Sequence, residues 1–259
     1  MIDLYNDDCL NKLKDIKNVD LIITSPPYFN VKNYSHWEIY EDFLKWLREV
    51  FILIFNSLKE GRFCCVNISN IIIPRENRSC ESKRLPLAFH FVNIMEQIGF
   101  KFIEDIIWEK PSGSVFNRNG GFFRNRQPLT YKPNCVNEYI FVFQKPCDFL
   151  IDEMIKGYKH KDVYIESLVS DDYEKTNIWK INPETKSKHP APFPLKLSDN
   201  LIRYYSYKND IILDPFMGSG TVGVSCKLLN RSFIGIELNK EYFCMAKSRI
   251  ENTINLFDL

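Results

Sequence analysis

The chain has 259 residues, of which 45% are hydrophobic and 26% charged, with 34 Lys and Arg against 33 Asp and Glu. These proportions are those of an ordinary folded protein, so they exclude intrinsic disorder and fibrous repeats, and the length accommodates one large domain or two small ones. No apolar run reaches the roughly 18 residues that cross a membrane, and the net charge of +1 does not by itself indicate a polyanionic partner.

The N-terminal residues contain neither a basic leader nor an apolar signal core, which leads us to expect a cytoplasmic protein. Eight cysteines in a chain of this length do not form a disulfide scaffold, and we expect reduced thiols. No Cys or His pair has the spacing of paired zinc ligands, so we expect no metal site.

Short apolar runs that end in turn residues alternate with helical patterns, which is typical of a parallel sheet with crossover helices. We therefore predict an α/β fold that is Rossmann-like, with a mostly parallel twisted sheet and helices on both faces. The predicted strands are residues 19–24, 61–68, 102–108, 139–144, 211–214 and 232–237, and the predicted helices are residues 40–58, 85–98 and 222–229.

The first predicted strand ends in the tetrapeptide Ser25-Pro26-Pro27-Tyr28. Two prolines fix two successive φ angles and remove two amide donors, so this tip is stiff and presents carbonyl acceptors at the carboxyl edge of the sheet. Ligands of open α/β sheets bind at that edge. The Ser25 hydroxyl and the Pro26 carbonyl are suited to hold the amino group of a flipped nucleobase, with the base stacked on Tyr28.

Two central segments do not fit the strand and helix pattern. Residues 111–133 contain no acidic residue and combine Phe116, Phe122 and Phe123 with the basic residues Arg118, Arg124, Arg126 and Lys132. Such a loop is suited to contact phosphates and to hold a duplex open. Residues 146–188 are polar and mixed in charge, which indicates a small insert outside the sheet.

The segment 211–221 reads as a buried strand that enters a glycine turn and then a helix. Gly218 and Gly220 allow a ligand to approach the backbone closely, and Glu237 ends the next strand, where a carboxylate holds ribose hydroxyls. The pattern predicts a nucleoside cofactor. Gly223 completes a GxGxxG spacing, so a NAD-dependent oxidoreductase is an alternative, whereas a P-loop is excluded because no Lys follows the second glycine.

The position of the glycine turn in the chain also predicts the order of the sheet. Only 22 residues follow Glu237, which is enough for one helix. The remaining strands must therefore come from upstream, and we expect a circularly permuted sheet in which the catalytic half precedes the cofactor half.

The tetrapeptide Ser25-Pro26-Pro27-Tyr28, followed far downstream by Asp214-Pro215-Phe216-Met217-Gly218-Ser219-Gly220-Thr221, resembles the beta-group amino DNA methyltransferases. Further similar segments are residues 106–110, 137–143 and 178–179 with 189–194. The resemblance implies S-adenosylmethionine as cofactor and catalytic roles for Ser25, Pro26, Pro27 and Tyr28. The cofactor-binding residues that it implies are Asp8, Thr24, Asp214, Phe216, Gly218, Gly220, Thr221, Glu237, Leu238 and His189.

The resemblance also implies a domain organisation and partners. Residues 1–145 and 189–259 would form the catalytic domain, and the insert at 146–188 would lie where the family places target recognition. Double-stranded DNA is the expected substrate, in a bacterial or archaeal nucleoid. A second copy of the chain and a cognate restriction endonuclease are the protein partners to consider.

Ser25 in the first catalytic position is similar to N4-cytosine enzymes, whereas N6-adenine enzymes usually carry Asp or Asn there. The sequence therefore favours cytosine and leaves adenine open. Protein-glutamine and RNA amine methyltransferases also use a Pro-Pro-Tyr corner, but they generally have Asn first and the cofactor motif upstream. A catalytically silent DNA-binding subunit is a third alternative.

Overall fold

The computed structural model describes residues 1–30, 37–75, 77, 79–115, 117–118, 120–151, 155, 161–184 and 193–254. Its elements, in chain order, are β1 (Ile2–Tyr5), α1 (Cys9–Lys12), β2 (Val19–Thr24), α2 (Tyr40–Ser57), β3 (Leu58–Ile68), β4 (Ile71–Ile73), β5 (Lys83–Leu85), α3 (Leu87–Ile98), β6 (Lys101–Glu109), a 3-10 turn (Ser112–Ser114), α4 (Gly120–Asn125), β7 (Asn137–Gln144), α6 (Lys161–Glu166), β8 (Ile178–Lys180), α7 (Leu195–Tyr205), β9 (Ile211–Asp214), α8 (Thr221–Leu228), β10 (Ser232–Ile236) and α9 (Lys240–Glu251).

One sheet of eight strands organises the described chain, in the order β1-β10-β9-β2-β3-β7-β6-β8. Neighbours pair in parallel except around β7, which runs antiparallel to both β3 and β6. The late strand β9 lies beside the early strand β2, with Leu21 opposite Ile212. The predicted α/β fold, the mostly parallel sheet and the permuted order of its two halves are therefore confirmed.

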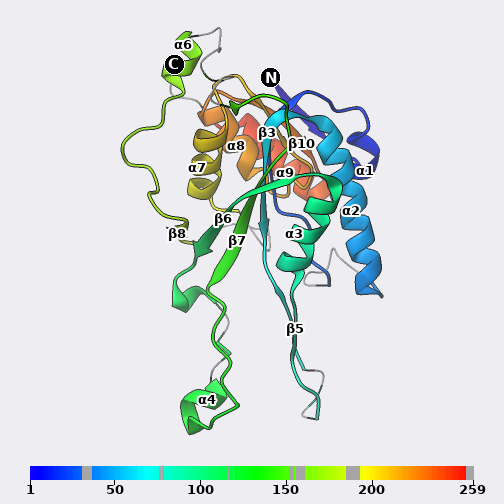
Figure 1. Ribbon diagram of the computed structural model, residues 1–259, viewed down its shortest axis with the longest axis vertical. Helices are drawn as coiled ribbons and strands as arrows, with labels where there is room; N and C mark the ends of the chain where they lie inside the picture. The colour runs from blue at the N-terminus through cyan, green and yellow to red at the C-terminus, as the bar shows by residue number, and fades with distance from the viewer. Residues whose placement is uncertain are drawn as a thin grey trace.

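Helices cover both faces of the sheet, as predicted (Figure 1). Along β2, Ile22 packs in the cluster formed with α2 and α3, whereas Leu21 and Ile23 pack in the cluster formed with α7, α8 and α9. The strand is completely buried. Burial on both faces explains why it reads as a continuous apolar run rather than as an alternating pattern.

The bounds of β2 and β9 agree with the prediction, and those of β3, β6, β7 and β10 differ by one to a few residues. The structure adds the short edge strands β1 and β8. Because β8 pairs in parallel with β6, residues 178–180 belong to the sheet, and the expectation that all of 146–188 lies outside it was wrong. In the described part of the chain, no helix is long and apolar enough to span a membrane.

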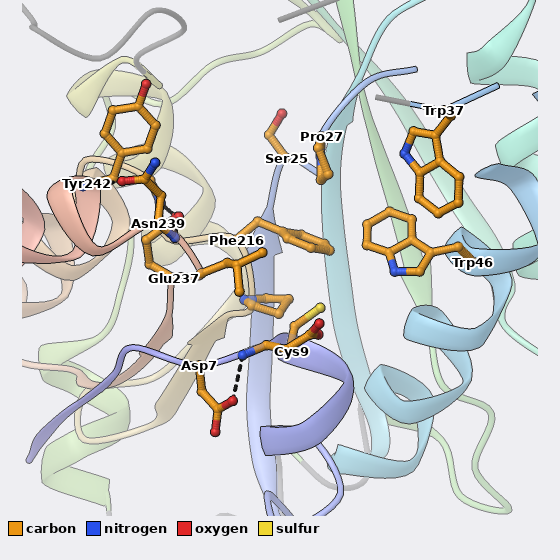
Figure 2. Close-up of a pocket in the computed structure, with 14 residues that line it drawn as sticks. Asp7, Cys9, Ser25, Pro27, Trp37, Trp46, Phe216, Glu237, Asn239 and Tyr242 are labelled. Atoms are coloured by element: carbon orange, nitrogen blue, oxygen red, sulfur yellow. Dashed lines mark hydrogen bonds between the residues drawn. The ribbon is translucent and has the colours of Figure 1, made fainter. Parts of the chain in front are cut away.

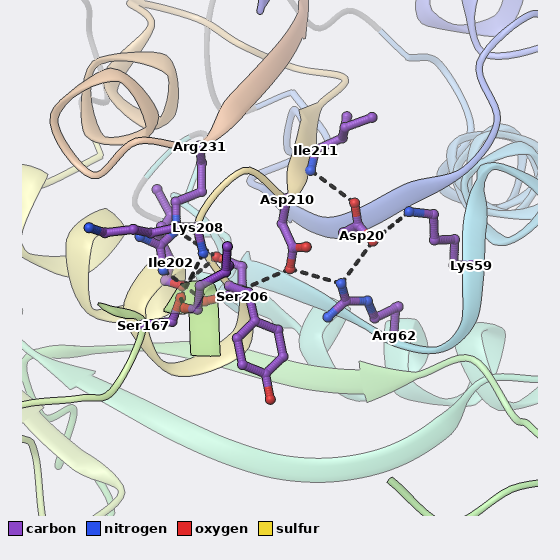
Figure 3. Close-up of polar contacts among 12 residues, drawn as sticks. Asp20, Lys59, Arg62, Ser167, Ile202, Ser206, Lys208, Asp210, Ile211 and Arg231 are labelled. Atoms are coloured by element: carbon purple, nitrogen blue, oxygen red, sulfur yellow. Dashed lines mark hydrogen bonds and ion pairs between the residues drawn. The ribbon is translucent and has the colours of Figure 1, made fainter. Parts of the chain in front are cut away.

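A buried ion network holds the amino ends of the central strands (Figure 3). Arg62 Nη2 donates to Asp20 Oδ1 and to Asp210 Oδ2, both at 2.8 Å, and Lys59 Nζ lies 2.7 Å from Asp20 Oδ1. Burial alone would raise the pKa of Asp20, but the Ile211 amide and the two cations lower it below its ordinary value. The network therefore joins β2, β3 and the turn before β9 at the edge opposite the predicted site.

Two extensions project from the carboxyl edge of the sheet, while α6 lies at the opposite end of the molecule (Figure 1). One is the hairpin of β4 and β5, and the other is the connection from β6 to β7 that carries α4. They touch where Lys132 Nζ donates to Ser82 Oγ at 3.2 Å. We call them the hairpin arm (residues 71–85) and the loop arm (residues 110–136).

Candidate active site

A cavity of about 550 Å³ opens at the carboxyl edge of the sheet, beside the ends of β2, β9 and β10 (Figure 2). Its walls come from distant parts of the chain. The residues that line it are Asp7, Asp8, Cys9, Ser25, Pro27, Trp37, Trp46, Pro215, Phe216, Gly218, Glu237, Leu238, Asn239 and Tyr242. The predicted catalytic tip and the predicted glycine turn therefore face the same space, and the volume is that of a small-molecule site.

Ser25 and Pro27 line the cavity, whereas Pro26 is buried. The Ser25 hydroxyl donates to Oδ1 of the buried Asn67 on β3 at 3.4 Å, and the Asn67 amide donates to the Tyr139 carbonyl on β7 at 3.4 Å. Since the Ser25 proton points to Asn67, the lone pairs of its oxygen can accept hydrogens from a ligand. Asn67 was not predicted from the sequence.

Tyr28 is half-buried and is not among the residues that line the cavity. Its hydroxyl lies 3.5 Å from Glu138 Oε2 on β7, and Glu138 also forms an ion pair with Lys110. Lys110 in turn lies 4.4 Å from the centroid of the Trp108 ring. These contacts direct Tyr28 toward the base of the loop arm rather than toward Gly218.

Glu237 directly follows β10 and lines the cavity with a carboxylate whose two oxygens both accept hydrogen bonds. Its Oε2 accepts from the Gly218 amide and its Oε1 from the Asn239 amide, each at 2.8 Å. These bonds fix the carboxylate and leave each oxygen able to accept a further hydrogen. Burial raises the pKa of Glu237 above its ordinary value, although both backbone bonds oppose that shift.

Thr24 and Asp214, which are 190 residues apart in sequence, bond to each other behind the cavity. Thr24 Oγ1 donates to Asp214 Oδ1 at 2.7 Å, and the Phe216 amide donates to the same oxygen at 3.1 Å. Burial raises the pKa of Asp214 to about 7, against the lowering effect of both bonds. This contact holds the tips of β2 and β9 side by side, while Phe216 itself lines the cavity.

Gly220 and Thr221 lie behind the cavity wall rather than on it. Gly220 has a φ of +78°, and a Cβ there would lie 2.9 Å from the Ala246 Cβ on α9, so its small size makes room for a helix. The guanidinium of Arg249 donates to the Ser219 carbonyl at 2.9 Å and to Thr221 Oγ1 at 3.2 Å. Helix α9 thereby fixes the shape of the glycine turn.

Asp8 and Leu238, which the sequence analysis predicts as cofactor-binding residues, both line the cavity. Asp8 also caps α1, because its Oδ1 accepts from the Leu10 amide at 2.8 Å. The predicted residue His189 lies outside the described residues. The neighbouring Cys9 presents a neutral thiol, since burial raises its pKa to about 12.

Seven lining residues were not among the predicted site residues: Asp7, Cys9, Trp37, Trp46, Pro215, Asn239 and Tyr242. Trp37 and Trp46 form a wall opposite Glu237 in Figure 2, with ring centroids 5.6 Å apart, and the Trp46 ring lies 5.9 Å from that of Phe216. Of these residues, Asn239 could have been identified from the sequence as the N-cap of the last helix. In the structure, its side chain accepts hydrogen bonds from the Glu241 and Tyr242 amides of α9.

The predicted DNA-contacting residues lie on the loop arm. Arg124, Arg126 and Lys132 are exposed, whereas Arg118 is half-buried and donates to Cys135 Sγ at 3.4 Å. None of the four lines the cavity, but the arm projects from the same edge of the sheet.

Within the insert, helix α6 lies at the amino edge of the sheet, away from the cavity. Ser167 Oγ accepts from the Lys208 amide at 2.8 Å, and Glu166 pairs with the Lys208 ammonium at 2.9 Å, in the turn before β9. These contacts place residues 166–167 at the opposite edge from the cavity (Figures 1 and 3).

The residues that line this cavity combine acidic and aromatic side chains. Among the described residues that line the cavity are three carboxylates, Asp7, Asp8 and Glu237, and no Lys or Arg, which favours a ligand with positive charge and hydroxyl groups. Phe216 and Trp46 supply aromatic faces. Within the described residues, no group of three or more His, Cys, Asp or Glu is placed to hold a metal.

Comparison with known proteins gives a family match over most of the chain. A family model described as DNA methylase, named for N6 and N4 methylation, matches residues 19–248. The type II beta methyltransferase M.BslI of Bacillus sp. (strain NEB-606) is 30% identical over 88% of this chain, which spans 25% of that relative's length. The orphan methyltransferase M.BamHII of Bacillus amyloliquefaciens is 29% identical, with 92% of this chain and 91% of the relative covered.

Among solved structures, protein TTHA0409 of Thermus thermophilus superimposes with a TM-score of 0.79 at 25% identity, covering 98% of this chain and 96% of its own. The same Thermus protein has been solved in complex with S-adenosyl-L-methionine.

Proposed function

Because the chain belongs to the DNA methylase family, we propose that it transfers a methyl group from S-adenosylmethionine to an exocyclic amine of a base in duplex DNA. The observation that carries this proposal is that Ser25 and Gly218 line the same cavity. A methyl transfer requires its donor and acceptor in one space, where fixed orientation supplies much of the rate. The alternative of a NAD-dependent oxidoreductase has no support from the family match.

The donor side of the proposal rests on Glu237 and its surroundings. When bound, S-adenosylmethionine supplies an electrophilic methyl on a sulfonium. Glu237 would accept from the ribose hydroxyls with the lone pairs that Gly218 and Asn239 leave open. Phe216 would pack on the adenine, and the acidic residues Asp7 and Asp8 favour a ligand that carries positive charge.

The acceptor side rests on the tip of β2. The lone pair of an exocyclic amine is conjugated with its ring and is poorly nucleophilic. Ser25 Oγ and the Pro26 carbonyl would accept the two amine hydrogens and favour a pyramidal nitrogen with its lone pair directed at the methyl. Asn67 supports this role, because its Oδ1 accepts the hydrogen bond of the Ser25 hydroxyl and orients the hydroxyl oxygen. Tyr28, which directly follows the cavity-lining Pro27, would provide a stacking face for the base.

We propose cytosine N4 as the target, with adenine N6 as the alternative. A neutral hydroxyl at position 25 both accepts and donates, whereas a carboxylate only accepts. The observation that favours cytosine is the residue type, since Ser25 in the first catalytic position is similar to N4-cytosine enzymes and N6-adenine enzymes usually carry Asp or Asn there.

The names of two relatives suggest the biological setting. M.BslI is a type II methyltransferase and M.BamHII an orphan methyltransferase. We propose that this chain methylates specific sites in the DNA of its own cell as part of a restriction-modification system. The basic side chains that would contact the DNA phosphates are those of Arg118, Arg124, Arg126 and Lys132. A cognate endonuclease and a second copy of the chain are the protein partners to test.

The proposal is tested with radiolabelled methyl transfer and calorimetry on the purified chain. We expect micromolar binding of S-adenosylmethionine and incorporation of label into duplex DNA. Tight binding of NADH without affinity for S-adenosylmethionine would contradict the proposal. Binding of S-adenosylmethionine with no methyl transfer to any duplex would instead indicate the catalytically silent subunit.

A further inference from the structure

The tip of the loop arm presents apolar side chains to solvent. Leu129 is completely exposed, and Phe123 on α4 is 74% exposed. Between them, the rings of Phe122 and Tyr131 meet edge to face with centroids 5.2 Å apart, which holds the outgoing and returning parts of the arm together. The exposure of Leu129 and Phe123 therefore belongs to a tip that is internally packed.

Leu129 also has a backbone conformation that its residue type disfavours. The Thr130 amide donates to the Gln127 carbonyl at 3.3 Å, and Pro128 and Leu129 are the two central residues of this turn. Pro at the second position and a positive φ at the third are typical of a type II turn, in which the third residue is usually Gly. Leu129 has a φ of +68°. A branched apolar residue thus occupies a strained position without burying its side chain, which is a feature that function more than stability explains.

The surroundings of this tip carry positive charge. Residues 111–133 contain Arg118, Arg124, Arg126 and Lys132 and no acidic residue. Lys132 also ties the loop arm to Ser82 of the hairpin arm, which carries Lys83 and Arg84. An exposed apolar tip with a basic surround is complementary to a nucleic acid duplex, whose phosphates flank an apolar base stack.

Resting on the proposed function, we propose that Leu129, assisted by Phe123, is a wedge that enters the base stack of duplex DNA where the target nucleotide is extruded. The basic residues of the two arms would hold the flanking phosphates. The arms lie at the carboxyl edge, the same edge as the cavity. A wedge there stabilises the extruded state by occupying the space that the base leaves.

The test compares single-turnover methylation of two duplexes that contain the recognition site. One duplex has the normal base pair at the target, and the other has the target base opposite a mismatch, which is already easier to extrude. For Leu129→Gly we expect a rate roughly tenfold lower on the matched duplex and close to that of the wild type on the mismatched one. An equal loss of methylation rate on both duplexes, or no loss on either, would contradict the proposed role of Leu129 as a wedge.

Stability provides a second readout, because Gly relieves the strain of the turn. Leu129→Gly should leave the melting temperature unchanged or higher, and a lower value would indicate a structural role instead. The matched control is Leu168→Gly, since Leu168 is 61% exposed and follows α6 at the opposite edge. This control should methylate both duplexes like the wild type.

The phosphate contacts are tested by the salt dependence of binding to the same duplex. Arg124→Gln with Arg126→Gln should reduce the slope of log K against log salt by roughly two. Lys101→Gln, at the exposed start of β6, should not change the slope. An unchanged slope in the double variant would show that Arg124 and Arg126 of the loop arm do not contact the phosphates. Failure of the wild type to methylate any duplex would contradict the proposed function, whereas normal wild-type activity with an unaffected Leu129→Gly variant would contradict only the wedge.

Discussion

Replacing Glu237 by Gln tests the donor side of the site with the smallest change in shape. In the wild type, each carboxylate oxygen accepts one backbone N–H at 2.8 Å, from Gly218 and from Asn239. An amide can satisfy only one of these donors, and its NH₂ group would face the other. The variant also loses the negative charge in a partly buried position.

The magnitude follows from the bonds that the carboxylate would make to a ribose. A hydrogen bond to a charged group contributes about 1.5–3 kcal/mol. Loss of one such bond weakens binding roughly 10- to 150-fold. Titration calorimetry with S-adenosylmethionine measures this change, and Glu241→Gln, in the exposed first turn of α9, is the matched control.

The pH dependence of binding adds an independent check. Burial raises the pKa of Glu237, so the wild type should lose affinity as the pH falls through a value above the ordinary pKa of a glutamate. The Gln variant cannot be protonated there, and its affinity should not show this step. A variant that binds within about threefold of the wild type, with the same pH profile, would refute the role of Glu237.

Three further substitutions test other parts of the molecule. Ser25→Ala should lower the methylation rate about 100-fold while leaving cofactor affinity intact in calorimetry, because only the amine loses an acceptor. Gly220→Ala should destabilise the fold by about 2–4 kcal/mol in urea titrations, since φ is +78° and Ala246 blocks the new Cβ, whereas Gly113→Ala meets no atom within 4 Å and should be neutral. Arg62→Met should lower the free energy of unfolding by about 3–5 kcal/mol without changing cofactor affinity. The substitution removes the guanidinium that pairs with the buried carboxylates of Asp20 and Asp210 at the amino edge.

The central strands were predictable because burial on both faces leaves a clear pattern. β2 and β9 are short apolar runs bounded by turn residues, and their ends follow the prediction residue by residue. The edge strands β1 and β8 were not predicted. Each has only three or four residues and is partly exposed, so neither carries a long apolar run.

The site was predictable only where a strand tip or a glycine turn marked it. Ser25 and Glu237 directly follow strands and Gly218 lies in the turn after β9, so the parallel order brings all three to one edge. Trp37 and Trp46 belong to the segment after that tip and to α2, and their approach to Phe216 depends on how the helix packs. The contact of Asn67 with Ser25 likewise depends on the pairing of β2 with β3.

Modification-sensitive sequencing of DNA from cells that express the chain tests the central claim most directly. We expect N4-methylcytosine at one short sequence in cells with the wild-type chain, and none in cells with Ser25→Ala. N6-methyladenine in place of methylcytosine would overturn the choice of base and retain the amine chemistry. DNA without any methylated exocyclic amine, from cells in which the folded chain is abundant, would contradict the transfer at this cavity.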